Sequence, residues 1–326
     1  MAHTLHRATL ALHTPLGTPL AGDTLFGQLC WALREAAGEA ELRRRLHGYT
    51  AGHPWLVVSD GFPAGYLPRP TLPHRLAEPS AVAAEHAGQH AAAERKAARQ
   101  KRWLAVDHRD GVLSVAPAPA VDDATAYGQA PQRRAQAHNT LDRRTGTTGG
   151  DPFVPYSVAR TFHAAGQAID LYLVLDEERT TAAEVGALLA AVGQTGFGRD
   201  AGIGLGKFSV ARRAAVTFAV AAAANAHWTL APCAPQGQGF SPTASYWQVL
   251  TRFGRHGNIA ARGGTPFKTP VLLAATGAVF VSDGPFTARL FVGQGIGGDG
   301  RLSKSQPDTV QQGYAPVVSH VLETRR

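Results

Sequence analysis

Residues 196–208 read GFGRDAGIGLGKF, and five of the eleven positions from 196 to 206 are glycine. Glycine reaches positive φ without strain, and it lets backbone amides approach a phosphate closely. Upstream, Thr181 and Glu184 form a capping-box pattern. The apolar residues that follow it have helical spacing: Val185, Leu188, Leu189 and Val192. Residues 207–220 read as a strand, so the sequence predicts a helix, a glycine-rich loop and a strand in this order.

Two familiar nucleotide-binding motifs fail on this loop. A Walker A loop needs glycine at position 201 and Ser or Thr at position 208, where the chain has Ala201 and Phe208. The dinucleotide fingerprint is met by Gly196, Gly198 and Ala201, but it requires a strand before the loop and a helix after it. Nucleotide hydrolysis and hydride transfer are therefore disfavoured. A phosphate-binding loop of another kind and a flexible turn without a ligand both remain open.

The elements expected earlier in the chain favour an α+β fold. Residues 3–14 and 55–59 read as strands, and a helix with an apolar face is expected between them, with Asp23 as its N-cap and Gly38 as its stop. Residues 168–175 alternate as a strand before the helix described above. Strand, helix, strand, twice over, is the pattern of a ferredoxin-like unit.

The fold class that we predict is α+β, with two tandem ferredoxin-like (RRM-like) domains, a glycine-rich loop and loop or helix insertions. The first domain spans residues 1–218 and carries the insertions. The second spans residues 219–326, is smaller, and consists of short strands with Gly and Pro turns.

Two segments look like insertions, and the positive charge gathers near them. Residues 81–104 have helical composition with few large apolar side chains, while residues 128–151 read as a long loop or extended hairpin. Cationic residues exceed acidic ones within 85–109, 131–165 and 199–213, and Arg supplies 27 of the 32 cationic residues. This clustering is typical of a protein with a polyanionic partner, although separate solvated basic surfaces would have the same composition.

Several classes of protein are excluded or disfavoured. The two cysteines, Cys30 and Cys233, support neither a disulfide framework nor a four-thiolate metal site. His86 and His90 have metal-ligand spacing but lack the Glu of an HExxH motif. No apolar run approaches the length of a membrane span, so we expect a cytoplasmic protein without a membrane partner. His138 lies among arginines and could serve as a general base in RNA cleavage, but an RNA contact is the favoured interpretation.

Five further segments accompany the glycine loop, and they occur in order along the chain. They read GDTLFGQLCWA (22–32), LPRP (67–70), HNTLDR (138–143), PFKTP (266–270) and QGYAP (312–316). Together with the loop they resemble the RAMP subunits of CRISPR effector complexes. They are most similar to the fourth subunit of the type III-A Csm complex.

The resemblance implies a noncatalytic subunit that holds the 5′ handle of the crRNA and needs neither cofactor nor metal. Its partners would be the large multidomain signature subunit and the repeating backbone subunit, with target RNA contacted indirectly. The residues assigned to RNA binding are Gly22, His138, Asn139, Arg143, Arg144, Gly196, Gly198, Arg199, Gly202, Ile203, Gly204, Gly206, Lys207 and Lys268. The alternative is a metal-independent endoribonuclease of the same superfamily that matures CRISPR RNA.

Overall fold

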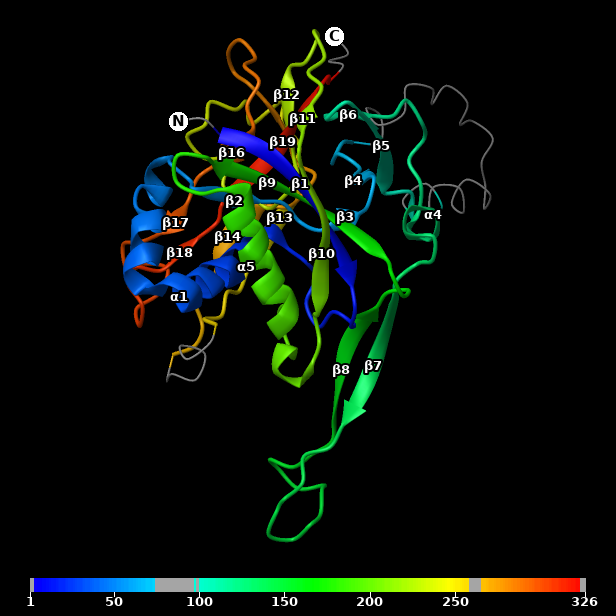
Figure 1. Cartoon of the computed structure of the whole chain (residues 1–326), viewed down its shortest axis with the longest axis vertical. Helices are drawn as coiled ribbons and strands as arrows, with labels where there is room; N and C mark the ends of the chain where they lie inside the picture. Colours follow the sequence, from blue (N-terminus) through cyan, green and yellow to red (C-terminus); the bar gives the residue numbers. More distant parts are fainter. Residues whose placement is uncertain (1–2, 74–96, 98–99, 258–264, 323–326) are drawn as a thin grey trace.

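The computed structural model describes residues 3–73, 97, 100–257 and 265–322 (Figure 1). The fold is mixed α+β and rich in sheet. In the part of the chain that is described, it includes the helices α1 (Gly22–Leu46), α4 (Asp123–Tyr127) and α5 (Ala182–Thr195), with short 3-10 turns at Tyr49–Ala51 (η1) and Ala201–Ile203 (η2). Among the described residues, no helix is both long enough and apolar enough to cross a membrane.

The first sheet has the strand order β10-β1-β9-β2, and its neighbours are antiparallel. Its strands are β1 (His3–Leu12), β2 (Leu56–Val58), β9 (Ala168–Asp176) and β10 (Phe208–Ala215), with β3 (Phe62–Pro63) beside β9. Helix α1 follows β1 and α5 follows β9, so the elements of this layer occur along the chain in the order β1-α1-β2-β9-α5-β10, with α4 and further strands between β2 and β9. Helix α5 packs on β10, α1 packs on β2, and the two helices touch each other.

The face of this sheet that lies away from the helices is also covered. Tyr172 on β9 is fully buried, and its ring packs 5.2 Å from that of Phe218 and 6.4 Å from that of Phe62. A second sheet supplies the cover, with the order β11-β6-β5-β4. Its strands are β4 (Tyr66–Pro68), β5 (Trp103–Arg109), β6 (Val112–Val115) and β11 (Thr217–Phe218). Base stacking on an open sheet face is therefore excluded here.

The part after residue 219 is built of strands. A four-stranded sheet has the order β15-β12-β19-β16, from β12 (Ala226–Thr229), β15 (Val279–Val281), β16 (Phe291–Gly293) and β19 (Tyr314–His320). Two ribbons pair β13 (Val249–Arg252) with β14 (Val271–Ala274) and β17 (Ile296–Gly297) with β18 (Val310–Gln311). The described residues of 219–326 contain no helix, so a second ferredoxin-like domain is not confirmed. One hydrophobic core includes Trp55, Leu173, Trp228 and Tyr314, and so spans both parts.

The segment expected to be a long loop or an extended hairpin, residues 128–151, is part of a hairpin. Strands β7 (Gln132–His138) and β8 (Tyr156–Phe162) pair antiparallel along their whole length. Figure 1 shows this ribbon projecting from the body of the molecule, with its connecting loop at the far end. We call residues 132–162 the arm.

Two local expectations are wrong, and a third falls largely outside the described residues. Asp23 is not the N-cap of α1, because the helix begins at Gly22 with Ala21 as cap, and the carboxylate pairs with Arg252 instead. Gly38 interrupts α1 with φ 87° but does not end it. Most of the helix expected over residues 81–104 lies outside the described residues, as do His86 and His90, and residues 103–104 already belong to β5.

Candidate nucleic-acid interface

The glycine loop connects α5 to β10, so a helix precedes it and a strand follows it, as predicted. Four of its glycines have positive φ: Gly196, Gly198, Gly204 and Gly206. A Cβ on Gly206 would lie 2.2 Å from the carbonyl oxygen of Phe197, and one on Gly196 would be nearly as close to another carbonyl oxygen. Gly198 is similarly crowded by a side chain. These three glycines are therefore explained by close packing of the loop on itself and on its neighbour.

The tip of the loop, residues 202–204, is different. A Cβ on Gly202 or Gly204 would meet no atom within 4 Å. Gly202 does not have positive φ, so neither backbone conformation nor crowding requires glycine there. Between them, the side chain of Ile203 is 66% exposed. The tip is thus the part of the loop where a ligand would find open backbone beside an apolar side chain.

Most amides of the loop already have partners within the protein. The amide of Lys207 donates to Thr14 Oγ1 at 2.8 Å, and that of Arg199 donates to Thr18 Oγ1 at 3.0 Å. The amide of Gly206 donates to the carbonyl of Pro15 at 2.9 Å. These bonds hold the loop against residues 13–18, a segment that the sequence did not single out. Fewer amides are therefore available to an anion than the glycine content alone predicts.

The base of the arm is attached to the same loop. Leu16 and Thr161 exchange two backbone hydrogen bonds of 2.9 Å. The guanidinium of Arg199 donates to the carbonyl of Ala159, and Arg160 Nη2 lies 3.8 Å from Asp200 Oδ2. The structure therefore brings together two of the basic windows, which are separated by some forty residues in the chain.

His138 lies inside the arm and is engaged there. Its ring stacks on that of Tyr156, with centroids 5.2 Å apart and planes 13° apart. Arg160 Nη2 lies 3.2 Å from His138 Nε2. Because a guanidinium can only donate, this nitrogen must be the acceptor. Tyr156 is 51% exposed, so the stack offers an aromatic edge to solvent.

The remaining arm residues lie toward its free end. Asn139, Arg143 and Arg144 are exposed, and their loop projects away from the body (Figure 1). Arg144 Nε lies 3.7 Å from Asp142, and its side chain is 90% exposed. These cations could meet a strand that runs along the arm, but they are not neighbours of the glycine loop.

Gly22 and Lys268 belong to other surroundings. Gly22 is buried at the start of α1, where a Cβ would lie 2.2 Å from the carbonyl oxygen of Val58. This close approach explains the glycine without a ligand. Lys268 pairs with Gly254 through its amide, and burial lowers the pKa of its side chain. Among the described residues, neither contacts the glycine loop.

Sequence reasoning missed Arg160, Tyr156 and Asp200. Tyr156 and Arg160 lie four residues apart on β8 and so share one face of the strand, which strand pairing could have placed on one arm. Asp200 has φ 65°, which no sequence pattern reveals.

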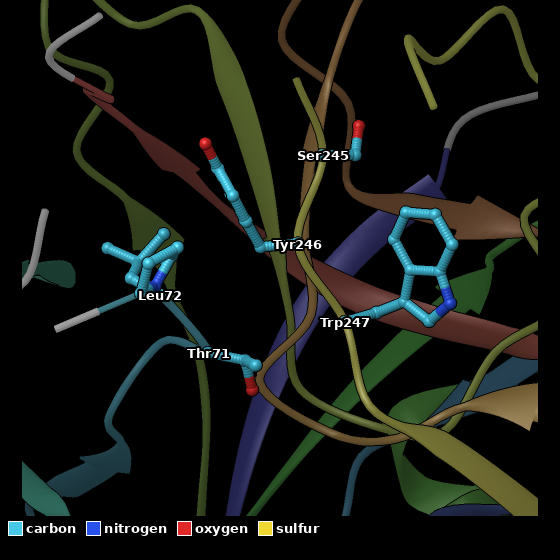
Figure 2. Close-up of a pocket in the computed structure, with 6 residues that line it drawn as sticks. Thr71, Leu72, Ser245, Tyr246 and Trp247 are labelled. Carbon is cyan, nitrogen blue, oxygen red and sulfur yellow. The ribbon is translucent and has the colours of Figure 1, made fainter. Parts of the chain in front are cut away.

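A shallow pocket of about 340 Å³ lies elsewhere, between residues 71–73 and 245–247 (Figure 2). Its lining among the described residues is Thr71, Leu72, Pro73, Ser245, Tyr246 and Trp247, which include no charged group and none of the predicted site residues. Among the described residues, no cluster of His, Cys, Asp and Glu could hold a metal ion.

No protein-family model and no curated protein matches the sequence. Solved structures do match. A chain of the Csm1–Csm4 cassette in complex with pppApA aligns over 99% of this chain and 100% of its own length, with 14% identity and a TM-score of 0.53. The cassette in complex with cA4 gives 15% identity, the same coverage and a TM-score of 0.54.

A chain of the Csm3–Csm4 subcomplex of the type III-A CRISPR–Cas interference complex aligns over 96% of this chain and 99% of its own, with 9% identity and a TM-score of 0.53. Csm4 is the component that these structures share. At such identities the likeness concerns the fold. The chain resembles Csm4 along nearly its whole length, and the resemblance inferred from its sequence motifs is confirmed.

Proposed function

We propose that this chain is a noncatalytic, RNA-binding scaffold subunit of a type III-A CRISPR complex, and that it holds the 5′ handle of the crRNA. Its protein partners would be the large signature subunit and the repeating backbone subunit, and it would meet target RNA only indirectly. Residues 1–218 would form a ferredoxin-like RNA-binding domain, and residues 219–326 a smaller domain that shares its core.

The observation that carries this proposal is the junction of the glycine loop with the base of the arm. The loop tip is open at Gly202 and Gly204, and the arm extends from the junction with exposed Arg143 and Arg144 at its end. Single-stranded RNA is held by cations along its backbone and by side chains that stack on its bases. The arginines supply the cations, and Ile203 and the His138–Tyr156 stack supply side chains for contacts with the bases. Neither a cofactor nor a metal is needed for such binding.

The endoribonuclease alternative needs a base that can take a proton from a 2′-hydroxyl. His138 is the candidate, but its Nε2 accepts from Arg160 and its ring face is covered by Tyr156. A nitrogen engaged in this way is not free to act as a base. The geometry therefore favours a scaffold over a nuclease.

The test uses a substitution at Gly202, because a side chain there meets open space and its backbone is not left-handed. We expect Gly202→Leu to weaken binding of a 5′-handle RNA at least about tenfold, since the added side chain would occupy the position of the strand. Binding would be measured by fluorescence anisotropy in EDTA, and the melting temperature should not change. Gly284→Leu is the matched control, because that glycine is also exposed, uncrowded and without positive φ.

Equal affinity of the two variants would contradict the assignment of the loop. Cleavage of the RNA in EDTA that disappears in His138→Ala would establish the nuclease instead.

A further inference from the structure

We propose that Arg160 and Arg199 form a binding site for an RNA phosphate. In the RNA-free chain the carboxylate of Asp200 occupies this site, and it leaves the site when RNA binds. The inference rests on the proposed function and adds regulation of the same site: an internal anion would compete with the strand.

The backbone of Asp200 is the first indication. Only two non-glycine residues have positive φ among the described residues, Asp110 at 48° and Asp200 at 65°. Asp110 and Gly111 form the two-residue turn between β5 and β6, where such angles are required and aspartate is common. Asp200 lies in a loop that otherwise uses glycine for this conformation. A glycine would adopt it with less strain, so the side chain of Asp200 is the feature to be explained.

Two guanidinium groups face that side chain. Asp200 Oδ2 lies 3.8 Å from Arg160 Nη2 and 3.7 Å from Arg199 Nε. Both distances are longer than a hydrogen bond, so the carboxylate balances the two positive charges without accepting a hydrogen bond from either guanidinium. A phosphate carries more acceptor oxygens and matches the planar fork of arginine, so it would satisfy both groups better.

Arg160 also has an unused donor. Its side chain is 8% exposed, and its Nε is buried with no hydrogen-bond partner among the described residues. The other nitrogens of the same guanidinium donate to Gln136 and His138. A buried donor without an acceptor is rare, because the hydration it gives up is not replaced. A phosphate oxygen that reached the Nε edge of this guanidinium would supply the missing acceptor.

The position of this phosphate site fits an RNA strand that contacts both the tip of the glycine loop and the arm. Arg160 belongs to the base of the arm, and Arg199 precedes the open tip of the glycine loop. RNA that contacts both the tip and the arm would pass between them, where Asp200 lies. The side chain of Asp200 is 26% exposed and makes no short contact with either arginine, so it can turn toward solvent.

The test compares the wild-type chain with Asp200→Asn, which keeps the shape and tolerates positive φ but removes the charge. We expect Asp200→Asn to bind single-stranded 5′-handle RNA about fivefold more tightly, which corresponds to ~1 kcal/mol. Asp200→Gly also removes the charge and relieves the backbone strain, so it should bind the RNA more tightly as well. This second variant keeps the test valid if Asp200→Asn folds poorly. Asp299→Asn is the control, because Asp299 lies 3.4 Å from Arg301 and its replacement changes the net charge equally.

Each outcome decides between the alternatives. If Asp200 only tethers the arm to the loop, both Asp200 variants will bind RNA as the wild type does or more weakly, which overturns the inference and leaves the proposed function intact. An equal gain in Asp299→Asn would reduce the effect to net charge and would overturn it as well. If the wild-type chain binds no handle RNA, the proposed function itself fails.

Discussion

Replacing Arg252 by methionine should destabilise the folded chain strongly. Asp23 is buried at the start of α1, with a side chain only 1% exposed. Arg252 on β13 donates to it twice, with Nε 2.6 Å from Oδ2 and Nη2 2.9 Å from Oδ1. Gln311 adds a long contact of 3.4 Å. Without the guanidinium, the carboxylate would stay buried with no countercharge hydrogen-bonded to it.

The size of the destabilisation follows from this geometry. Breaking a buried ion pair by removing one partner costs about 3–5 kcal/mol, because a charge is left uncompensated. The Arg252 side chain is 26% exposed, so water can partly replace it, and we expect the free energy of unfolding to fall by about 3 kcal/mol. Asp23→Asn together with Arg252→Met should recover most of this stability, since no charge then remains to be buried.

The assay is urea unfolding followed by circular dichroism, with the two single variants and the double variant forming a cycle. The reasoning would be refuted if Arg252→Met cost less than about 1 kcal/mol or if the two substitutions were additive. The pair also joins residue 23 to residue 252 across the proposed domain boundary. We therefore expect one cooperative transition, and two separate transitions would contradict a shared core.

Two further predictions concern pH and salt. Burial raises the pKa of the Asp60 carboxyl from 3.8 to about 7, so the folded chain keeps a proton that the unfolded chain releases near pH 4, and this group's contribution to stability falls as pH rises from about 4 to about 7. Asp60→Asn should therefore gain stability relative to wild type, by about 4 kcal/mol at most, between pH 4 and pH 8 in urea unfolding; a difference that is constant with pH would contradict this. Arg143→Ala with Arg144→Ala should flatten the plot of log K for RNA against log salt by ~1.4, at ~0.7 for each phosphate that the variant no longer neutralises. An unchanged slope would show that the end of the arm does not touch the strand.

Local patterns were sufficient for the elements that define the first sheet. The capping box of α5 forms as predicted, with the Glu184 amide donating to Thr181 Oγ1 at 3.2 Å and the Thr181 amide donating to Glu184 at 2.9 Å. The alternation over residues 168–175 became β9. These signals are local, since a cap or an alternating strand depends on neighbours a few residues away.

The failures depend on distant contacts. Asp23 has the sequence position of an N-cap, but Arg252, more than two hundred residues away, recruits its carboxylate. The second sheet was not predicted, because β4 and β5 pair across the segment that contains residues 74–96. Long-range pairing of this kind leaves no trace in hydrophobic periodicity.

The sequence likewise predicted only part of the candidate site. Glycine content and arginine clustering indicated the loop and the arm, but not which glycines the fold itself requires. Gly196 and Gly206 are fixed by crowding, whereas Gly202 is not, and this distinction exists only in three dimensions. It also selects the substitution that tests binding with the least disturbance of the fold.

The buried sheet explains why the proposed binding surface consists of a loop and an arm. In an open-faced RNA-binding sheet, exposed aromatic residues on the central strands stack on bases. Here the central strand β9 is buried, and the ring of Tyr172 packs against Phe62 of β3 and against Phe218 of the covering sheet. Binding must then use elements that leave the sheet at its ends. The glycine loop and the arm do so at the same end, where the Arg199 guanidinium donates to the carbonyl of Ala159, and the exposed aromatic Tyr156 lies on the arm. On the proposed function, the RNA contacts therefore belong to these two projections, which carry the exposed cations and the exposed ring, and not to the sheet face.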